Sequence, residues 1–367
     1  MKSQFNYYEN EIKALKKSNR YRERKISKPS MIDLASNDYL GLAHNKFLSI
    51  LAAESMFKLD AHGPKASMLV NGYSQVHADF EEALCLANGF DAGVLSGSGF
   101  NANIAMIEAL VRKGDAIFLD ERYHASGVLA ARLLSGKVFY FKHNDVEDLK
   151  RLYKESSAKR KIVAIEGIYS MDGDLAPKEI FDFCDEVGAL LIVDEAHSSG
   201  VIGNKLMGVF DYYNIEIKPN HIKMGTLGKA YGSFGGYILA SEHIIDYLLN
   251  RAKPLIYATA PSLFDTLLAH ESLKYIWNHS AILKEQIQAR QKVVFESLGI
   301  KVEGLIVPIL IDDNKKVLEI RARLDKVGFE VGAIRPPTVE RAIIRLIARL
   351  GVSSSKLKEA CELIKLG

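Results

Sequence analysis

The chain has 367 residues, 48% of them hydrophobic and 25% charged, a composition typical of soluble globular proteins. This length predicts two domains, or one large α/β domain with a smaller companion. A net charge of +3 gives no sign of a nucleic-acid-binding protein, and the longest apolar runs are strand-sized, too short to span a membrane.

The predicted elements begin with a charged helix over residues 5–25, which ends in a basic run. From about residue 45, helical stretches alternate with short β-branched runs, a pattern that indicates a mostly parallel sheet covered by helices. The predicted strands are AGVL (92–95), DAIFLD (115–120), KVFYF (137–141), KIVAIEG (161–167), ALLIVDEAH (189–197), IKMGTL (222–227) and GGYILA (235–240).

The regular alternation of predicted strands and helices ends at about residue 262. A long helical stretch over 261–298 leads into the apolar run VEGLIVPILI, another helix, the segment FEVGAI, and a last strand and helix. This order predicts a smaller α+β domain. We therefore expect three parts: an N-terminal helical segment (1–44), a large α/β domain (45–262) and a small C-terminal domain (263–367).

Five of the predicted strands end in polar sequences: SGSGF, DERYHAS, EGIYSMDGD, DEAH and TLGKAYG. Because ligands bind at the carboxyl ends of parallel strands, we expect these five segments to share one crevice.

Two nucleotide-binding interpretations fail on detail. The pair DEAH and GTLGKA resembles parts of a helicase-like ATPase, but Gly225 and Gly228 lie too close together for a P-loop. Ala230 stands where a P-loop has Ser or Thr, and the lysine follows DEAH instead of preceding it. The segment 97–102 fits G-x-G-x-x-A, a weak match that does not open the first βαβ unit, although the helix that follows could hold a phosphate at its N-terminus.

A pyridoxal phosphate site accounts for all the strand ends together. Lys229 would bind the cofactor covalently, Asp194 would pair with its pyridine nitrogen, and His197 would donate to its phenolic oxygen. His124 would cover the ring. The cofactor's phosphate would lie at the helix start 98–100, beside the hydroxyl of Thr226.

Longer motifs match a known family. They are SNDYLGL (36–42), NGYSQVH (71–77), SGF (98–100), HAS (124–126), HND (143–145), EGIYSMDGD (166–174), VDEAHSSGVIG (193–203), TLGKAYG (226–232) and IRPPTV (334–339). Over nearly its whole length the chain resembles the α-oxoamine synthases, pyridoxal-phosphate enzymes with the aspartate-aminotransferase fold (fold type I). EGxxSMDGD, DEAH and TxGKAxG in this order form the most specific part of the match.

The resemblance implies roles for the matching residues. Lys229, Asp194, His197 and His124 are the expected catalytic residues, and all four also contact the cofactor. The remaining expected cofactor contacts are Gly99, Phe100 and Thr226 at the phosphate, with Glu166 and Ser170 lining the pocket.

The resemblance also implies substrate contacts. Arg345 is expected to bind the amino-acid carboxylate, with Arg341 and Arg349 as alternatives because the loop after IRPPTV is short. The other expected substrate-binding residues are Asn37, Thr338 and either Arg20 or Arg22. The segment 63–69, GPKASML, has Pro, Lys and Ala where the family has glycines, which leaves the contact with the acyl carrier open.

IRPPTV resembles one branch of the family in particular. The implied reaction is a decarboxylative condensation of L-alanine with pimeloyl-CoA or a pimeloyl acyl carrier protein, giving 8-amino-7-oxononanoate in biotin biosynthesis. The alternatives are a 2-amino-3-oxobutyrate CoA ligase, a 5-aminolevulinate synthase, a long-chain aminoketone synthase, or a non-catalytic descendant of the fold. The family implies a homodimer with the active site at its interface.

Cysteines and histidines complete the expectations. Cys85, Cys184 and Cys361 lie far apart, as in a cytoplasmic protein with reduced thiols. The histidines have no metal-ligand spacing, so no metal site is expected. The N-terminus lacks the apolar segment of a secretory signal.

Overall fold

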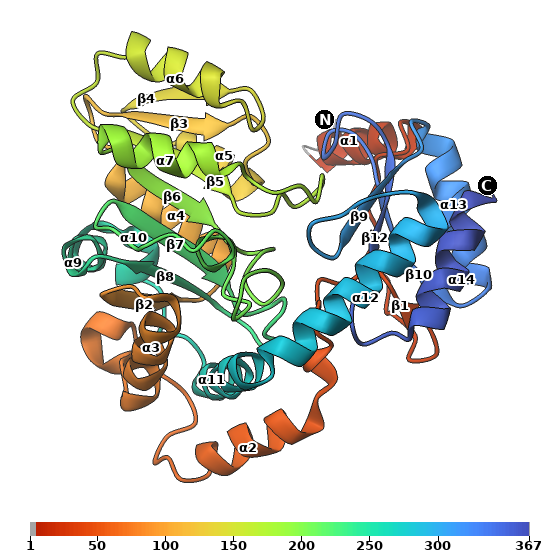
Figure 1. Ribbon diagram of the computed structural model, residues 1–367, viewed down its shortest axis with the longest axis horizontal. Helices are drawn as coiled ribbons and strands as arrows, with labels where there is room; N and C mark the ends of the chain where they lie inside the picture. The colour runs from red at the N-terminus through yellow and green to blue at the C-terminus, as the bar shows by residue number, and fades with distance from the viewer. Residues whose placement is uncertain (1–4, 367) are drawn as a thin grey trace.

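The computed structural model describes residues 5–366 of the chain. A large part built around a central sheet lies beside a smaller part that includes the helices α1 (Phe5–Lys17) and α14 (Ser354–Lys365), and the long helix α12 (Ser280–Leu298) runs between the two parts (Figure 1). Within the described residues, none of the helices has the length and apolar character needed to cross a bilayer.

The central sheet has seven strands in the order β2-β8-β7-β6-β5-β3-β4. Strand β8 runs antiparallel to both of its neighbours, and the other strand pairs are parallel. The predicted mostly parallel α/β sheet is therefore confirmed. The strands are β2 (Ala92–Ser96), β3 (Ala116–Asp120), β4 (Lys137–Phe141), β5 (Lys161–Glu166), β6 (Leu190–Asp194), β7 (His221–Thr226) and β8 (Gly236–Ala240).

Both faces of this sheet are buried, which explains why its strands are continuous apolar runs. In β5, Val163 and Ile165 face one core, whereas Ile162 and Ala164 face the other. The first core includes residues of α3 (Gln75–Asn88), α6 (Val146–Glu155) and α7 (Lys178–Val187). The second includes residues of α4 (Gly99–Leu110), α5 (Ala125–Ala131), α9 (Glu242–Arg251) and α10 (Lys253–Ile256). The short helix α8 (Val209–Tyr212) follows β6.

The small part is built on an antiparallel sheet in the order β11-β12-β9. Its elements are β9 (Ile306–Leu310), α13 (Asn314–Lys326), β11 (Gly332–Ile334), β12 (Ile343–Ile347) and α14 (Ser354–Lys365).

The N-terminal segment joins this small part through a two-residue strand. β1 (Ile32–Asp33) pairs in parallel with β10 (Phe329–Glu330), so residues from opposite ends of the sequence lie side by side. After a 3-10 turn (Leu42–His44), α2 (Lys46–Met56) packs on α11 (Leu263–Asn278) and precedes a π-helical turn (Met68–Gly72). The division at residues 44 and 262 remains a prediction, and residues 1–4 and 367 of its end parts lie outside the described residues.

Two predicted helices were too long. The N-terminal helix α1 (Phe5–Lys17) stops before the basic run, because the Ser18 hydroxyl bonds the carbonyls of the last turn and Asn19 adopts a left-handed conformation. The stretch 261–298 is divided into α11 and α12 (Ser280–Leu298) by His279. The His279 ring bonds the Tyr275 carbonyl at 2.8 Å, and its backbone leaves helical values.

Candidate active site

The polar strand ends meet at the carboxyl edge of the central sheet. Glu166, the last residue of β5, lies opposite Asp194, the last residue of β6, and β7 ends beside them at Thr226. β2 and β7 are both antiparallel to β8, so they point the same way, and the segment after β2 reaches the same edge.

Lys229 follows β7 and reaches His197. The Nζ atom of Lys229 lies 2.7 Å from His197 Nε2, and the other ring nitrogen of His197 lies 2.5 Å from the hydroxyl of Tyr39. Burial lowers the pKa of His197 well below its usual value, and the charge of Lys229 lowers it further. Tyr39 was not predicted from its residue type, although it lies within the SNDYLGL motif.

The amine of Lys229 is easier to deprotonate than that of an ordinary lysine. Burial lowers its pKa to about 8, and Arg345 lowers it too, while the negative charges of Asp194 and Glu166 act in the opposite direction. A larger fraction of this amine is therefore neutral near physiological pH, as a nucleophile or base requires.

Asp194 is buried and held by two donors. Its Oδ1 accepts from the Ala196 amide at 3.0 Å, and its Oδ2 accepts from Asn103 Nδ2 at 2.7 Å. Sequence reasoning missed Asn103. The available signal was an amide side chain on the otherwise apolar face of α4, where a buried polar group requires a partner.

Glu166 has one satisfied oxygen and one without a partner. Its Oε2 accepts from the Ser170 amide at 3.0 Å, whereas its buried Oε1 has no hydrogen-bond partner among the described residues. Burial raises the pKa of Glu166 well above the usual range, and the nearby Asp194 raises it further.

His124 lies at the start of α5, directly after the segment that follows β3. Its Nδ1 accepts from the Ser126 amide at 3.3 Å and lies 2.7 Å from the Ser126 hydroxyl. Burial lowers the pKa of His124, which favours the neutral ring.

The predicted phosphate-binding segment forms the N-terminus of α4. Ser98 caps this helix by accepting from the Asn101 amide at 3.1 Å, and Gly99 and Phe100 are its first two residues. A side chain at Gly99 would come within 3.3 Å of Thr226 Cβ, so the absence of a side chain keeps α4 and the end of β7 close. The helix amides suit a phosphate, whereas the Thr226 hydroxyl, which was expected to join them, donates to the Gly235 carbonyl at 3.0 Å in this structure.

Arg345, on β12, joins the small part to this site. Its Nε donates to the Ser170 carbonyl at 2.8 Å and its Nη1 donates to Asn37 Oδ1 at 3.0 Å. Its buried Nη2 has no hydrogen-bond partner among the described residues, and the side chain is only 6% exposed. A buried guanidinium with a free donor suits a carboxylate ligand.

The two alternative arginines have other partners. Arg341 is exposed and forms an ion pair with Asp312, at 2.8 Å from Nε. Arg349 is buried and donates to the carboxylates of Asp33 and Asp38, joining the N-terminal segment to the residues just after β12.

A groove of about 990 Å³ lies beside the strand ends and is lined in part by His124, Ser170 and Thr338. Arg22 donates to the Thr338 hydroxyl at 2.8 Å, so the N-terminal segment contacts the groove wall; Arg20 is exposed. Apolar residues form much of the remaining lining: Val128, Leu129, Met171, Pro308, Leu310, Pro336, Pro337, Val339 and Ile343.

The structure also brings together His143, Asp172 and Asp174, three residues whose side chains can bind metals. The ring of His143 bonds Asp120 at 3.0 Å through Nδ1 and Asp174 at 2.7 Å through Nε2. Burial opposes its protonation, but these two aspartates outweigh burial and raise its pKa to about 9. Both ring nitrogens of His143 face aspartate oxygens, so in this structure the cluster is held together by hydrogen bonds.

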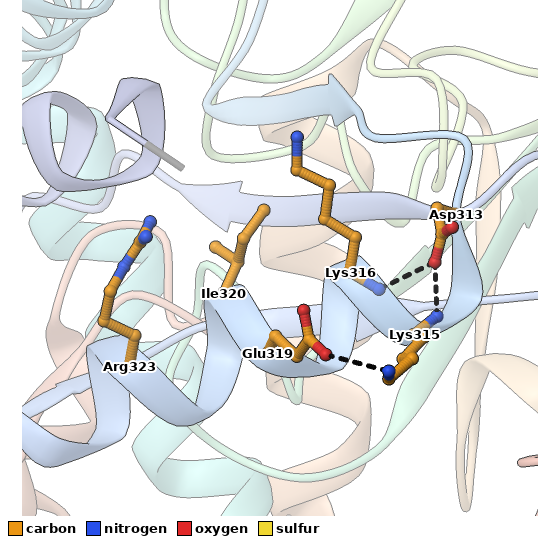
Figure 2. A pocket seen from close by; sticks show the side chains of 6 residues that line it. All are labelled: Asp313, Lys315, Lys316, Glu319, Ile320 and Arg323. Carbon is orange, nitrogen blue, oxygen red and sulfur yellow. Dashed lines mark hydrogen bonds and ion pairs between the residues drawn. The ribbon is translucent and has the colours of Figure 1, made fainter.

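A second, smaller pocket of about 400 Å³ lies on α13 (Figure 2). Asp313 caps the helix by accepting from the amides of Lys315 and Lys316, both at 2.7 Å, and Lys315 pairs with Glu319. These groups satisfy one another, and none of them belongs to the strand-end set.

Residues 29–364 match the family model described as aminotransferase class I and II. The chain belongs to this family, as its fold and the arrangement of its strand ends indicate.

Its curated relatives define the branch. A relative named 8-amino-7-oxononanoate synthase from Helicobacter pylori is 41% identical over 350 residues, which cover 95% of this chain and 94% of the relative. A putative 8-amino-7-oxononanoate synthase from Aquifex aeolicus is 36% identical, over 98% of this chain and 96% of its own length. The chain is an enzyme of the α-oxoamine synthase group, and this prediction is confirmed.

Solved structures agree with the fold. A serine palmitoyltransferase from Sphingomonas wittichii superposes with a TM-score of 0.89 at 25% identity, covering 99% of this chain and 97% of its own. An 8-amino-7-oxononanoate synthase from Francisella tularensis gives a TM-score of 0.78 at 24% identity, covering 92% and 98%. The second likeness supports the fold only.

Proposed function

We propose that this enzyme condenses L-alanine with a pimeloyl thioester, releasing carbon dioxide and a free thiol and giving 8-amino-7-oxononanoate for biotin biosynthesis. The observation that carries the proposal is the meeting of Lys229, Asp194 and Arg345 at one edge of the sheet, in a chain whose curated relatives are named for this product.

The donor set fits pyridoxal phosphate, which a solved serine palmitoyltransferase of the same fold contains. When bound, this cofactor would supply an electron sink for the carbanion at the α-carbon of alanine. Lys229 would hold it covalently, Asp194 would pair with its ring nitrogen, and His197 would donate to its phenolic oxygen. The other residues proposed to hold it are Gly99, Phe100, Thr226, His124, Glu166 and Ser170.

Lys229 would also move the proton from the α-carbon. Its lowered pKa, about 8, leaves more of the amine free to act as a base than an ordinary lysine would have. Tyr39 bonds the other ring nitrogen of His197 and so fixes the orientation of that ring beside the amine.

Arg345 would bind the alanine carboxylate through its free Nη2. The two other donors of this guanidinium are fixed by Asn37 and the Ser170 carbonyl, so the side chain is oriented before the substrate binds. Asn37 therefore supports the substrate contact. Arg341 and Arg349 are weaker candidates because their guanidinium groups are paired with aspartates.

The acyl chain would lie in the groove beside His124, whose apolar walls suit methylene groups. Of the two N-terminal arginines, Arg22 is the proposed contact, because it already bonds Thr338 on the groove wall. The groove is compatible with either pimeloyl-CoA or a pimeloyl acyl carrier protein as donor.

A homodimer is also part of the proposal. Large apolar side chains that are more than 60% exposed include Phe47, Phe57, Val70, Phe234 and Tyr257. The family implies a second copy of the chain as partner, and these exposed side chains are the proposed candidates for its interface. The mass in solution, measured by light scattering, tests this; a monomer at micromolar concentration would contradict it.

The proposal keeps the cytoplasmic location, with which the three free, buried cysteines agree. Cell fractionation with an antibody against the protein would test it.

The test of the function is a product assay. Alanine, glycine and serine are each supplied with pimeloyl-CoA and with pimeloyl carrier protein, and the product mass is measured. Preference for glycine or serine, or for another acyl chain, would favour a different α-oxoamine synthase. In Lys229→Ala, the visible absorbance of the lysine-bound cofactor and turnover should both disappear, and full activity would refute the proposed site.

A further inference from the structure

A continuous set of hydrogen bonds connects α4 with His124. The Tyr123 hydroxyl donates to Asn103 Oδ1 at 2.8 Å. Asn103 Nδ2 donates both to Asp194 Oδ2, at 2.7 Å, and to Ser126 Oγ, at 3.0 Å. Ser126 Oγ in turn lies 2.7 Å from His124 Nδ1. Asn103 and Ser126 are both fully buried, so water does not compete for these bonds.

The direction of the bond between Ser126 and His124 follows from the backbone. The Ser126 amide points at His124 Nδ1 at 3.3 Å, and an amide N–H can only donate. Nδ1 is therefore an acceptor and carries no proton. Since the Ser126 hydroxyl faces the same nitrogen, its proton must point toward Nδ1, and its oxygen is left to accept from another group.

The hydrogen bonds at the Asn103 end of this set require the same donor and acceptor roles. With its NH2 group toward Asp194 and Ser126, the Asn103 side chain donates to two acceptors, and its oxygen accepts from the Tyr123 phenol. The reverse orientation of the amide would set Oδ1 against the Asp194 carboxylate, which is repulsive. Burial raises the pKa of Tyr123 well above its usual value, so the phenol keeps the proton that it donates.

A neutral imidazole has one ring proton, and with Nδ1 occupied as an acceptor this proton must be on Nε2. Burial lowers the pKa of His124, which keeps the ring neutral near physiological pH. His124 also lines the groove assigned to the acyl chain.

We propose that Asn103 and Ser126 are positioning residues that fix His124 in the tautomer protonated on Nε2, so that His124 offers a hydrogen-bond donor to the carbonyl oxygen of the acyl thioester. This inference rests on the proposed function. A carbonyl oxygen only accepts hydrogen bonds, so the opposite tautomer would present a lone pair and could not stabilise the charge that develops on that oxygen. The same amide of Asn103 also holds Asp194, so one side chain orients both residues.

The tautomer can be measured directly. The holoenzyme is labelled with ¹⁵N at the histidine rings, and the His124 signals are assigned by their loss in His124→Asn. Near neutral pH the spectrum should show Nε2 protonated and Nδ1 unprotonated. A proton on Nδ1, or on both nitrogens, would overturn the proposal. The tautomer is observed in the wild-type protein, and apart from the assignment with His124→Asn it does not depend on whether Asn103→Ala or Ser126→Ala folds.

Ser126→Ala tests the role of the hydroxyl. Loss of one buried hydrogen bond should lower kcat by roughly 3- to 10-fold, leave the KM for alanine within about 2-fold, and shift the His124 nitrogen signals. Asn103→Ala should shift the same signals, because it removes the donor that orients the Ser126 hydroxyl.

Ser272→Ala is the matched control. Ser272 is a buried serine on α11 whose hydroxyl has no hydrogen-bond partner among the described residues. This variant should leave kcat and the His124 signals unchanged. If Ser126→Ala behaves like Ser272→Ala in both measurements, the positioning role is refuted. The ring signals can be recorded without turnover. If the proposed acyl substrate is wrong, no product forms but the His124 spectrum still shows the expected tautomer; if the positioning role is wrong, the spectrum itself differs from the expected one.

Discussion

Replacing Arg345 with alanine tests the proposed contact with the amino-acid substrate. The guanidinium is 6% exposed, two of its nitrogens are bonded to protein groups, and Nη2 is the free donor. A hydrogen bond to a charged group contributes about 1.5–3 kcal/mol. Since about 1.4 kcal/mol corresponds to a tenfold change, kcat/KM for alanine should fall by roughly 10- to 150-fold.

The assay is steady-state product formation at varied alanine with the acyl thioester saturating. Arg151→Ala is the control, because Arg151 on α6 is exposed, pairs with Glu155 at the surface and does not line the groove; kcat/KM should remain within about 2-fold. Circular dichroism of both variants checks that each is folded. A folded Arg345→Ala protein whose kcat/KM for alanine changes by less than about 3-fold would refute the assignment of this residue.

Three further predictions concern stability and titration. Arg349→Ala removes the partner of two aspartates and should lower the free energy of unfolding by about 3 kcal/mol in urea denaturation; a loss below about 1 kcal/mol would show that this buried pair is dispensable. Binding of pyridoxal phosphate to the apoenzyme needs the free amine of Lys229, so its rate should rise through a pH of about 8, and a midpoint near that of ordinary lysine would contradict the burial effect. Burial raises the pKa of Glu81 to about 7, so the folded state holds a proton that the unfolded state loses near 4.5; stability from this group is present below that lower value and is lost as pH rises toward 7. Glu81→Gln should flatten the melting temperature between pH 5 and 7, and an unchanged slope would exclude Glu81 as its source.

Much of the fold could be predicted because its local signals agree. The buried strands of a parallel sheet are apolar on both faces, so they stand out as continuous runs such as KIVAIE and ALLIVD. The polar residues that follow these runs must lie at the carboxyl edge, so the order of runs and polar ends is enough to predict that Glu166, Asp194 and Thr226 lie together. The reversed direction of β8 was not predicted, because an apolar run has the same pattern in either direction.

Helix ends were less predictable than strands. The composition of residues 5–25 favours a helix throughout, but a hydroxyl at Ser18 and a left-handed Asn19 end it early. Likewise, the apolar spacing of α11 continues into α12, and the break depends on one histidine side chain bonding its own helix. Such helix ends depend on single side-chain hydrogen bonds, which the hydrophobic periodicity of a sequence does not reveal.

The sequence by itself determined the class of the fold and indicated the residues proposed to do the chemistry, because Lys229, Asp194 and His197 lie at the ends of recognisable strands and within family motifs. Only the tertiary structure decided which groups orient them. Tyr39 reaches His197 across 158 positions, Asn103 reaches Asp194 across 91, and Arg345 reaches Asn37 across 308. It also gave the three candidate arginines different partners: Arg345 bonds Asn37 and the Ser170 carbonyl, whereas Arg341 and Arg349 pair with aspartates. The reason is physical: a hydrogen bond depends on position and direction to within a few tenths of an ångström, and the packing of the two parts of the molecule sets both.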